Sequence, residues 1–91
     1  MPVRYRRAAT VVWRHSNGRV LARPVGDDEV VVLTDSGEDL WELLIDQPTL
    51  DEMAIGLAGT YGASAAQVRA DIEPVLADLV TRGIVERTRP A

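Results

Sequence analysis

Few side chains in this chain could carry out chemistry. His15 is the single histidine, there is no cysteine, and no serine or aspartate stands in a recognisable nucleophile setting. Zinc sites and nucleophile–base pairs need thiolates, imidazoles or an activated hydroxyl. His15 lies among arginines beside a turn, where a solvated surface histidine is expected. The inventory therefore predicts that the protein is not an enzyme and has no metal site or cofactor.

Two further patterns resemble ligand sites only in composition. Residues 27–29 are three acids in a row, but a calcium loop needs alternating ligands and a terminal bidentate acid. Gly56, Gly59 and Gly62 recur at helical spacing, whereas a phosphate-binding loop lies between a strand and the start of a helix. We interpret the first pattern as a solvated turn and the second as part of a helix.

Charge divides the chain into a basic start and an acidic body. The formal net charge is −4, yet residues 1–24 contain six arginines and no acid. Residues 35–80 contain ten acids and one arginine, a balance of −9. An acidic body repels phosphate and favours a basic peptide or protein partner, although solubility alone explains the acidity equally well.

The size and hydropathy of the chain define its broad class. Ninety-one residues with 46% hydrophobic content predict one domain, and no run approaches the roughly 18 apolar residues of a membrane span. The start of the sequence lacks the apolar core of a signal peptide. We expect a single cytoplasmic domain over residues 1–91, with no membrane partner, a weakly ordered lead-in over residues 1–7 and an ordered core from about 8 to 87.

The first third of the chain favours strands. Residues 8–15 and 19–25 are rich in strand-forming side chains, and the Asn17-Gly18 pair between them is a strong signal for a type I′ hairpin turn. A third strand is predicted from Glu29 to Thr34, where four consecutive apolar residues follow a turn. These patterns predict a three-stranded antiparallel meander.

Three helices are predicted after the meander. Apolar residues recur at helical spacing over residues 35–46, directly after the third strand. The segment 49–52 is a capping box that opens a second helix, and Gly62 is expected to end it. The segment 64–67 is a second capping box, and Gly83 is a natural stop for the third helix.

The end of the chain adds two expectations. Pro74 inside the third helix predicts a kink, unless the helix starts later than its cap suggests. Residues 84–88 form either a short last strand or an extended segment. Together these elements predict an α+β, winged-helix-like fold in which a three-stranded antiparallel sheet is followed by three helices.

The third strand raises the question of a partner. Residues 30–33 are apolar on both faces, and a strand with an unpaired edge can accept an extended peptide as an additional strand. The alternatives are a strand buried on both sides and a homodimer edge. Nucleic acid is a poorer partner, because the third helix offers Asp71, Glu73 and Asp78 against two arginines.

Several motifs, in this order and spacing, resemble PqqD-like proteins, the recognition elements of ribosomally made and post-translationally modified peptides. The motifs are Leu33-Thr34, Asp35-Ser36-Gly37, Leu40-Trp41-Glu42-Leu43-Leu44, Pro48-Thr49-Leu50, and the series Val68, Asp71, Ile72, Val75, Leu76, Leu79, Gly83, Ile84 and Val85. The likeness covers residues 8 to 87. The chain has Arg23-Pro24-Val25-Gly26-Asp27 where PqqD itself has a Tyr-Pro-Glu-Gly-like segment. This difference, together with the length, makes the chain more similar to the discrete leader-binding protein of lasso-peptide clusters.

The resemblance implies a non-catalytic role. Such a domain binds the leader peptide of a precursor as a strand antiparallel to its third strand, in a groove shared with its third helix. It then presents the leader to a separate leader peptidase and a macrolactam-forming cyclase. The runner-up hypothesis is a winged-helix nucleic-acid-binding or regulatory module.

The resemblance also implies site residues. Val30 to Leu33 would pair through their backbone, Val75 and Leu79 would form an apolar pocket, and Asp71 and Asp78 would meet a tyrosine hydroxyl or a basic side chain. For each residue, core packing or solubility is the alternative. The full implied set is Glu29, Val30, Val31, Val32, Leu33, Thr34, Asp71, Val75, Asp78 and Leu79.

Overall fold

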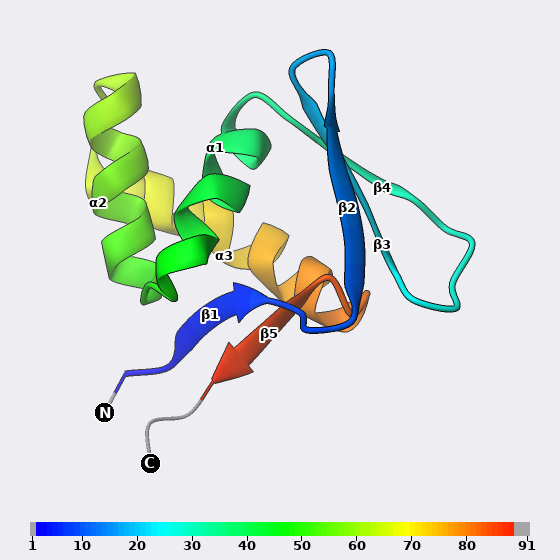
Figure 1. The fold of residues 1–91 in the computed structure, drawn as a ribbon. Coiled ribbons are helices and arrows are strands. Elements are labelled where there is room, and N and C mark those ends of the chain that lie inside the picture. The colour runs from blue at the N-terminus through cyan, green and yellow to red at the C-terminus, as the bar shows by residue number, and fades with distance from the viewer. Residues whose placement is uncertain (1, 89–91) are drawn as a thin grey trace.

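A computed structural model describes residues 2–88 of the chain (Figure 1). Met1 and residues 89–91, which the predicted domain includes at its two ends, lie outside the described residues. The elements in chain order are β1 (Arg4–Arg7), β2 (Val11–Ser16), β3 (Arg19–Pro24), β4 (Val31–Thr34), α1 (Ser36–Leu43), a 3-10 turn η1 (Leu44–Asp46), α2 (Leu50–Tyr61), α3 (Ala65–Thr81) and β5 (Val85–Thr88).

Strands β2, β3 and β4 form the predicted antiparallel meander, in that order. Asn17 and Gly18 both have positive φ, at 52° and 74°, so the predicted type I′ hairpin turn is confirmed. The third strand is shorter than predicted, because Glu29 and Val30 lie outside β4. Pro24, at the end of β3, has no amide to donate, and its carbonyl accepts from the amide of Asp27 at 3.1 Å. The ladder between β3 and β4 therefore ends at the Ala22–Val31 pair, two residues short of Glu29.

The predicted lead-in is wrong for Arg4–Arg7, which form strand β1 and pair antiparallel with β5. The register puts Arg4 opposite Thr88 and Arg7 opposite Val85. This pair is a second, two-stranded sheet, separate from the meander, and it confirms a last strand after α3. Local sequence could not reveal β1, because its partner lies at the other end of the chain.

The helix ends follow the sequence signals closely. Thr49 and Glu52 make the complete capping box at the start of α2, and Gly62 ends that helix in the left-handed conformation. The box at Ser64 is only half formed. Its hydroxyl accepts from the amide of Gln67, but the Gln67 side chain donates to Asp71 instead of returning to the cap. Because α3 begins at this cap and runs through Pro74, the alternative of a later start is wrong.

A Schellman motif ends α3. The amide of Gly83 donates to the carbonyl of Val80 at 3.1 Å, and the amide of Ile84 donates to that of Leu79 at 3.0 Å. Gly83 has φ of 76°, which disfavours other residues. The motif reverses the chain directly into β5, so the end of α3 is held in a defined position.

The core lies between the helices and one face of the meander. Figure 1 shows the helices on one side of the β2–β3–β4 sheet, and no helix of the described chain covers its other face. Within the meander, Val20, Ala22 and Leu33 are buried. The largest fully buried side chains are Trp41, Leu40, Leu44, Met53, Leu76, Ile84, Val20 and Val85.

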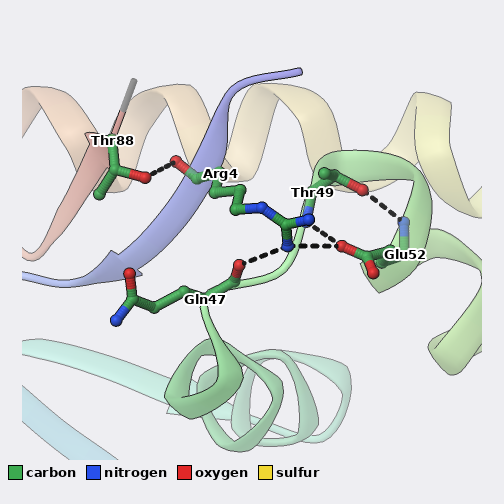
Figure 2. A network of polar contacts seen from close by, with 5 residues as sticks. All are labelled: Arg4, Gln47, Thr49, Glu52 and Thr88. Carbon is green, nitrogen blue, oxygen red and sulfur yellow. Dashed lines mark hydrogen bonds and ion pairs between the residues drawn. The ribbon is translucent and has the colours of Figure 1, made fainter. Parts of the chain in front are cut away.

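Arg4 attaches β1 to the start of α2 (Figure 2). One of its terminal nitrogens donates to the Gln47 carbonyl and to the Glu52 carboxylate, both at 3.1 Å. The same carboxylate oxygen accepts from the amide of Thr49 at 2.8 Å. This backbone hydrogen bond is the main reason why the pKa of Glu52 lies below its ordinary value. The hydroxyl of Thr88 donates to the Arg4 carbonyl, which ties in β5 as well.

Arg7 attaches the other end of β1 to α1. Its Nε and Nη2 donate to the carbonyl of Trp41 at 3.1 and 2.8 Å. Its guanidinium carbon lies 4.6 Å from the ring centre of Trp13 and 4.8 Å from that of Trp41. Burial lowers the pKa of Arg7, and the nearby Glu42 carboxylate opposes that shift. Arg7 therefore joins β1, β2 and α1 through one side chain.

Replacing Arg7 by alanine should lower the free energy of unfolding by about 2 kcal/mol, because two hydrogen bonds from a charged group and two cation–π contacts are lost. Arg6→Ala is the matched control, since Arg6 makes only an exposed ion pair with Glu86. Its cost should stay below about 1 kcal/mol. Urea unfolding of both variants measures the difference, and equal costs would contradict the structural role of Arg7.

Candidate functional site

Strand β4 has an open edge and one open face. It pairs with β3 on one side, and its other edge has no strand partner among residues 2–88. Leu33 is buried and Val31 packs against the core, whereas Val32 is 50% exposed. The alternative that this strand is buried on both faces is therefore wrong. The open edge is a row of backbone donors and acceptors that can bind an extended chain.

The hairpin determines which backbone groups lie on that edge. In a two-residue turn the flanking residues, Ser16 and Arg19, form a hydrogen-bonded pair, and such pairs alternate along a ladder. In β3, Arg19 and Leu21 therefore bond to β2, and the intervening residues bond to β4. It follows that Leu33, opposite Val20, points its backbone groups at β3. Val32 points its amide and carbonyl at the open edge.

The last turn of α3 lies near the start of β4. A hollow of about 210 Å³ separates them, lined by Pro24, Asp27, Glu29, Val31, Thr81 and Arg82. Arg82 crosses this region, since its Nη1 lies 2.6 Å from Glu29 and its Nε lies 2.9 Å from Asp78. These two carboxylates, Asp78 first, raise the pKa of Arg82. The strand edge and the helix thus meet at an ion-paired corner.

The four helix residues of the implied site differ in their surroundings. Val75 is 43% exposed, whereas Leu79 is 2% exposed and belongs to the core cluster. Asp71 accepts a hydrogen bond from Gln67, and Asp78 is paired with Arg82. The structure therefore brings Asp78 to Glu29 through Arg82. Asp71 lies about two helical turns before Asp78 on α3, and Leu79 is buried in the core.

Sequence reasoning missed Arg82 and Thr81 as neighbours of β4. The spacing of Asp78 and Arg82 is that of a helical ion pair, which the sequence does display. The contact with Glu29 joins residues 53 positions apart, and no local pattern encodes it. Arg69 of α3 is ion-paired with Asp51 and Glu73, and Arg82, which caps the helix, is ion-paired with Glu29 and Asp78.

The outer face of the meander carries a second hollow, of about 240 Å³. Its lining includes Val12, Leu21 and Val30 together with Arg14 and Arg23. Val12 and Val30 are nearly half exposed. This face is apolar and basic, in contrast to the acidic helices on the other side of the sheet.

The remaining candidates from the sequence stay at the surface. His15 is half exposed, and its Nε2 lies 2.9 Å from the Glu42 carboxylate. Asp27, in the predicted turn, is exposed and accepts from the amide of Glu29. Residues 2–88 contain no group of three His, Asp or Glu side chains arranged to hold a metal ion. Within the same residues no helix is long and apolar enough to cross a membrane.

Two solved structures share this fold. TbiB1, solved in complex with the TbiA(beta) leader peptide, is 19% identical and has a TM-score of 0.82, over 93% of this chain and 99% of its own. The PqqD truncation of Methylobacterium extorquens PqqCD, a functional and stand-alone RiPP recognition element solved by NMR, is 26% identical. It has a TM-score of 0.74, over 92% of this chain and 89% of its own. The fold is that of a RiPP recognition element, and the predicted winged-helix-like α+β class is confirmed.

The family follows from the sequence match. Residues 18–85 match the family described as Coenzyme PQQ synthesis protein D (PqqD), and the chain belongs to this family. No curated protein sequence matches it. Domains of this family are non-catalytic peptide-binding modules, so the prediction that the protein is not an enzyme is confirmed by its family.

The open edge of β4 predicts a contrast in amide exchange. The amide of Val32 should exchange with solvent at least about tenfold faster than that of Leu33, because only the latter is bonded to β3. NMR spectra of isotope-labelled protein, recorded after transfer to deuterated water, measure both rates. Equal protection of the two amides would contradict an open edge and indicate that a second copy covers it.

Proposed function

We propose that this protein recognises the leader peptide of a ribosomally synthesised, modified peptide. The leader binds as an extended strand antiparallel to β4. One observation carries the proposal: in a chain of the PqqD family, β4 presents an unpaired edge, and its first residue, Val31, lines a hollow with Thr81 and Arg82 at the end of α3. An added strand satisfies backbone groups that otherwise bond only to water.

The backbone of β4 supplies the affinity in this proposal, and the side chains around it supply the choice of sequence. Within the segment Val30 to Thr34, Val32 points its amide and carbonyl at the pairing edge, and Leu33 holds the strand on the core. Val75, half exposed on α3, is an apolar contact for a leader side chain. Asp71 and Asp78 are polar contacts on the same helix, and Leu79 supports them from inside.

The sequence of the β3–β4 connection bears on which biosynthetic pathway the protein serves. The segment Arg23 to Asp27 departs from the segment expected of PqqD itself, which favours a pathway other than coenzyme PQQ synthesis. We assign the chain to lasso-peptide biosynthesis, where it delivers the bound precursor to a leader peptidase and a macrolactam-forming cyclase. Since such precursors are made on ribosomes, this delivery takes place in the cytoplasm.

The direct test is a fluorescence-polarisation titration with a labelled leader peptide from the precursor encoded beside this gene. Binding at micromolar concentrations or below is expected. The same peptide with its residues in scrambled order is the control, and it should bind at least about tenfold more weakly, since pockets as well as backbone select the leader. Absence of binding by the native leader would refute the proposal.

Strand addition makes a prediction for one residue of β4. Val32→Pro should weaken leader binding by about tenfold or more, because proline deletes the amide that points at the open edge. The fold should survive, since proline is tolerated in an edge strand where the missing amide faces solvent. The control is Val32→Thr, which keeps the amide and should bind nearly as well as the wild type.

Circular dichroism and urea unfolding establish that both variants are folded, and titration gives their affinities. Similar affinities of two folded variants would argue against strand addition. A leader that bound through side chains alone would give that result.

A further inference from the structure

The candidate groove lies between β4, with the segment that precedes it, and the last turn of α3. Arg82 spans the gap between these two sides. Its Nη1 donates to Glu29 at 2.6 Å, and its Nε donates to Asp78 at 2.9 Å. Asp78 lies one turn earlier on the same helix, whereas Glu29 lies in the segment that precedes β4. Among the ion pairs of residues 2–88, Arg82–Glu29 is the one that joins this segment to α3.

The two partners of Arg82 differ in how firmly they are held. The Arg82 amide donates to the carbonyl of Asp78 at 3.0 Å, and the Schellman motif at Gly83 fixes the turn that follows. Glu29 belongs to no helix or strand, and its backbone amide donates to the side chain of Asp27, which is itself exposed. Glu29 is therefore the replaceable partner, and Arg82 with Asp78 is the fixed part.

The guanidinium of Arg82 has N–H donors that its two ion pairs do not use. Arginine carries five N–H donors in a planar fork. The bonds to Asp78 and Glu29 use Nε and Nη1, and no hydrogen bond within residues 2–88 uses Nη2. A carboxylate can bind the Nη1 and Nη2 sides of such a fork with two parallel hydrogen bonds.

Arg82 lies at the place that the carboxyl end of a docked peptide would reach. A strand antiparallel to β4 starts beside Thr34 and ends beside Val31. Its carboxyl end then reaches the hollow of about 210 Å³ that Val31, Glu29 and Arg82 share. This volume is several times the roughly 30 Å³ that one water occupies in the liquid, so a side chain fits.

We infer that Arg82 is a specificity residue that binds an acidic side chain at the carboxyl end of the docked leader segment, with that carboxylate taking the place of Glu29. The inference rests on the proposed function and adds the chemistry of one recognised position. Asp27, Glu29 and Asp78 are the carboxylates that face this corner. Of these, Glu29 competes with the leader directly.

A peptide library displayed on phage tests the inference with no leader sequence chosen in advance. Random twelve-residue peptides are selected on the immobilised full chain, and NMR shifts at Val32 identify those that dock on β4. Aspartate or glutamate should be enriched near the carboxyl end of these peptides. Selection on Arg82→Gln should lose that enrichment and keep the other preferences.

Affinity measurements with one selected peptide, on the wild type and on variants, test the role of Arg82 quantitatively. Changing its acid to the amide should weaken binding to the wild type about fivefold, the ratio expected of one exposed ion pair, and should not affect binding to Arg82→Gln. Glu29→Gln should strengthen binding of the acidic peptide, because the internal competitor loses its charge. Arg69→Gln is the matched control, an arginine of α3 paired with Asp51, and it should leave the affinity unchanged.

The outcomes separate this inference from the proposed function. Peptides that dock on β4 with no acidic preference, or with a basic one, would overturn the role of Arg82 and leave leader binding intact. If no selected peptide shifts Val32, strand addition itself fails, and the inference fails with it.

Discussion

The rest of the structure depends on the one-sided pairing of β4. This strand has four residues, bonds to β3 along one edge and buries Leu33 beneath it. Pro24 ends the ladder at one end, because it has no amide with which to continue the pairing to Glu29. At the other end α1 begins at Ser36 and takes the chain away from the sheet. A short edge strand limits unwanted pairing with other chains while leaving room for one specific partner.

The helices hold this edge in place without covering it. Trp41 is completely buried in α1, and its carbonyl accepts both hydrogen bonds from Arg7. The helix that follows β4 is thereby bound to β1, and β1 is bound to β5 after α3. The Schellman motif at Gly83 connects the same β5 to the end of α3. Both walls of the candidate groove are thus joined through the two-stranded sheet.

Sequence alone predicted the features that depend on short-range chemistry. The Asn17-Gly18 turn, the Thr49 capping box and the left-handed glycines at 62 and 83 each follow from the conformational preferences of a few adjacent residues. The order of sheet and helices followed from the change of period after residue 34. The family resemblance, carried by spaced motifs, is confirmed at the level of the PqqD family.

The parts that sequence could not supply depend on contacts between distant segments. Strand β1 consists of Arg4–Arg7, with no strand signature of its own, and it exists because β5 pairs with it. The start of β4 at Val31, opposite Ala22, depends on Pro24 of β3, which has no amide to continue the ladder toward Glu29. The Glu29–Arg82 ion pair depends on where α3 ends relative to the sheet. Each is a tertiary contact that overrides or extends a local preference.

Strand addition to β4 is tested most directly by isotope-filtered NMR of the labelled protein bound to its unlabelled leader peptide. The account predicts cross-peaks between the Val32 amide and backbone protons of the leader, in the order of an antiparallel strand running from Thr34 toward Val31. Cross-peaks confined to the outer face of the meander, around Val12 and Leu21, with none at the β4 backbone, would contradict it.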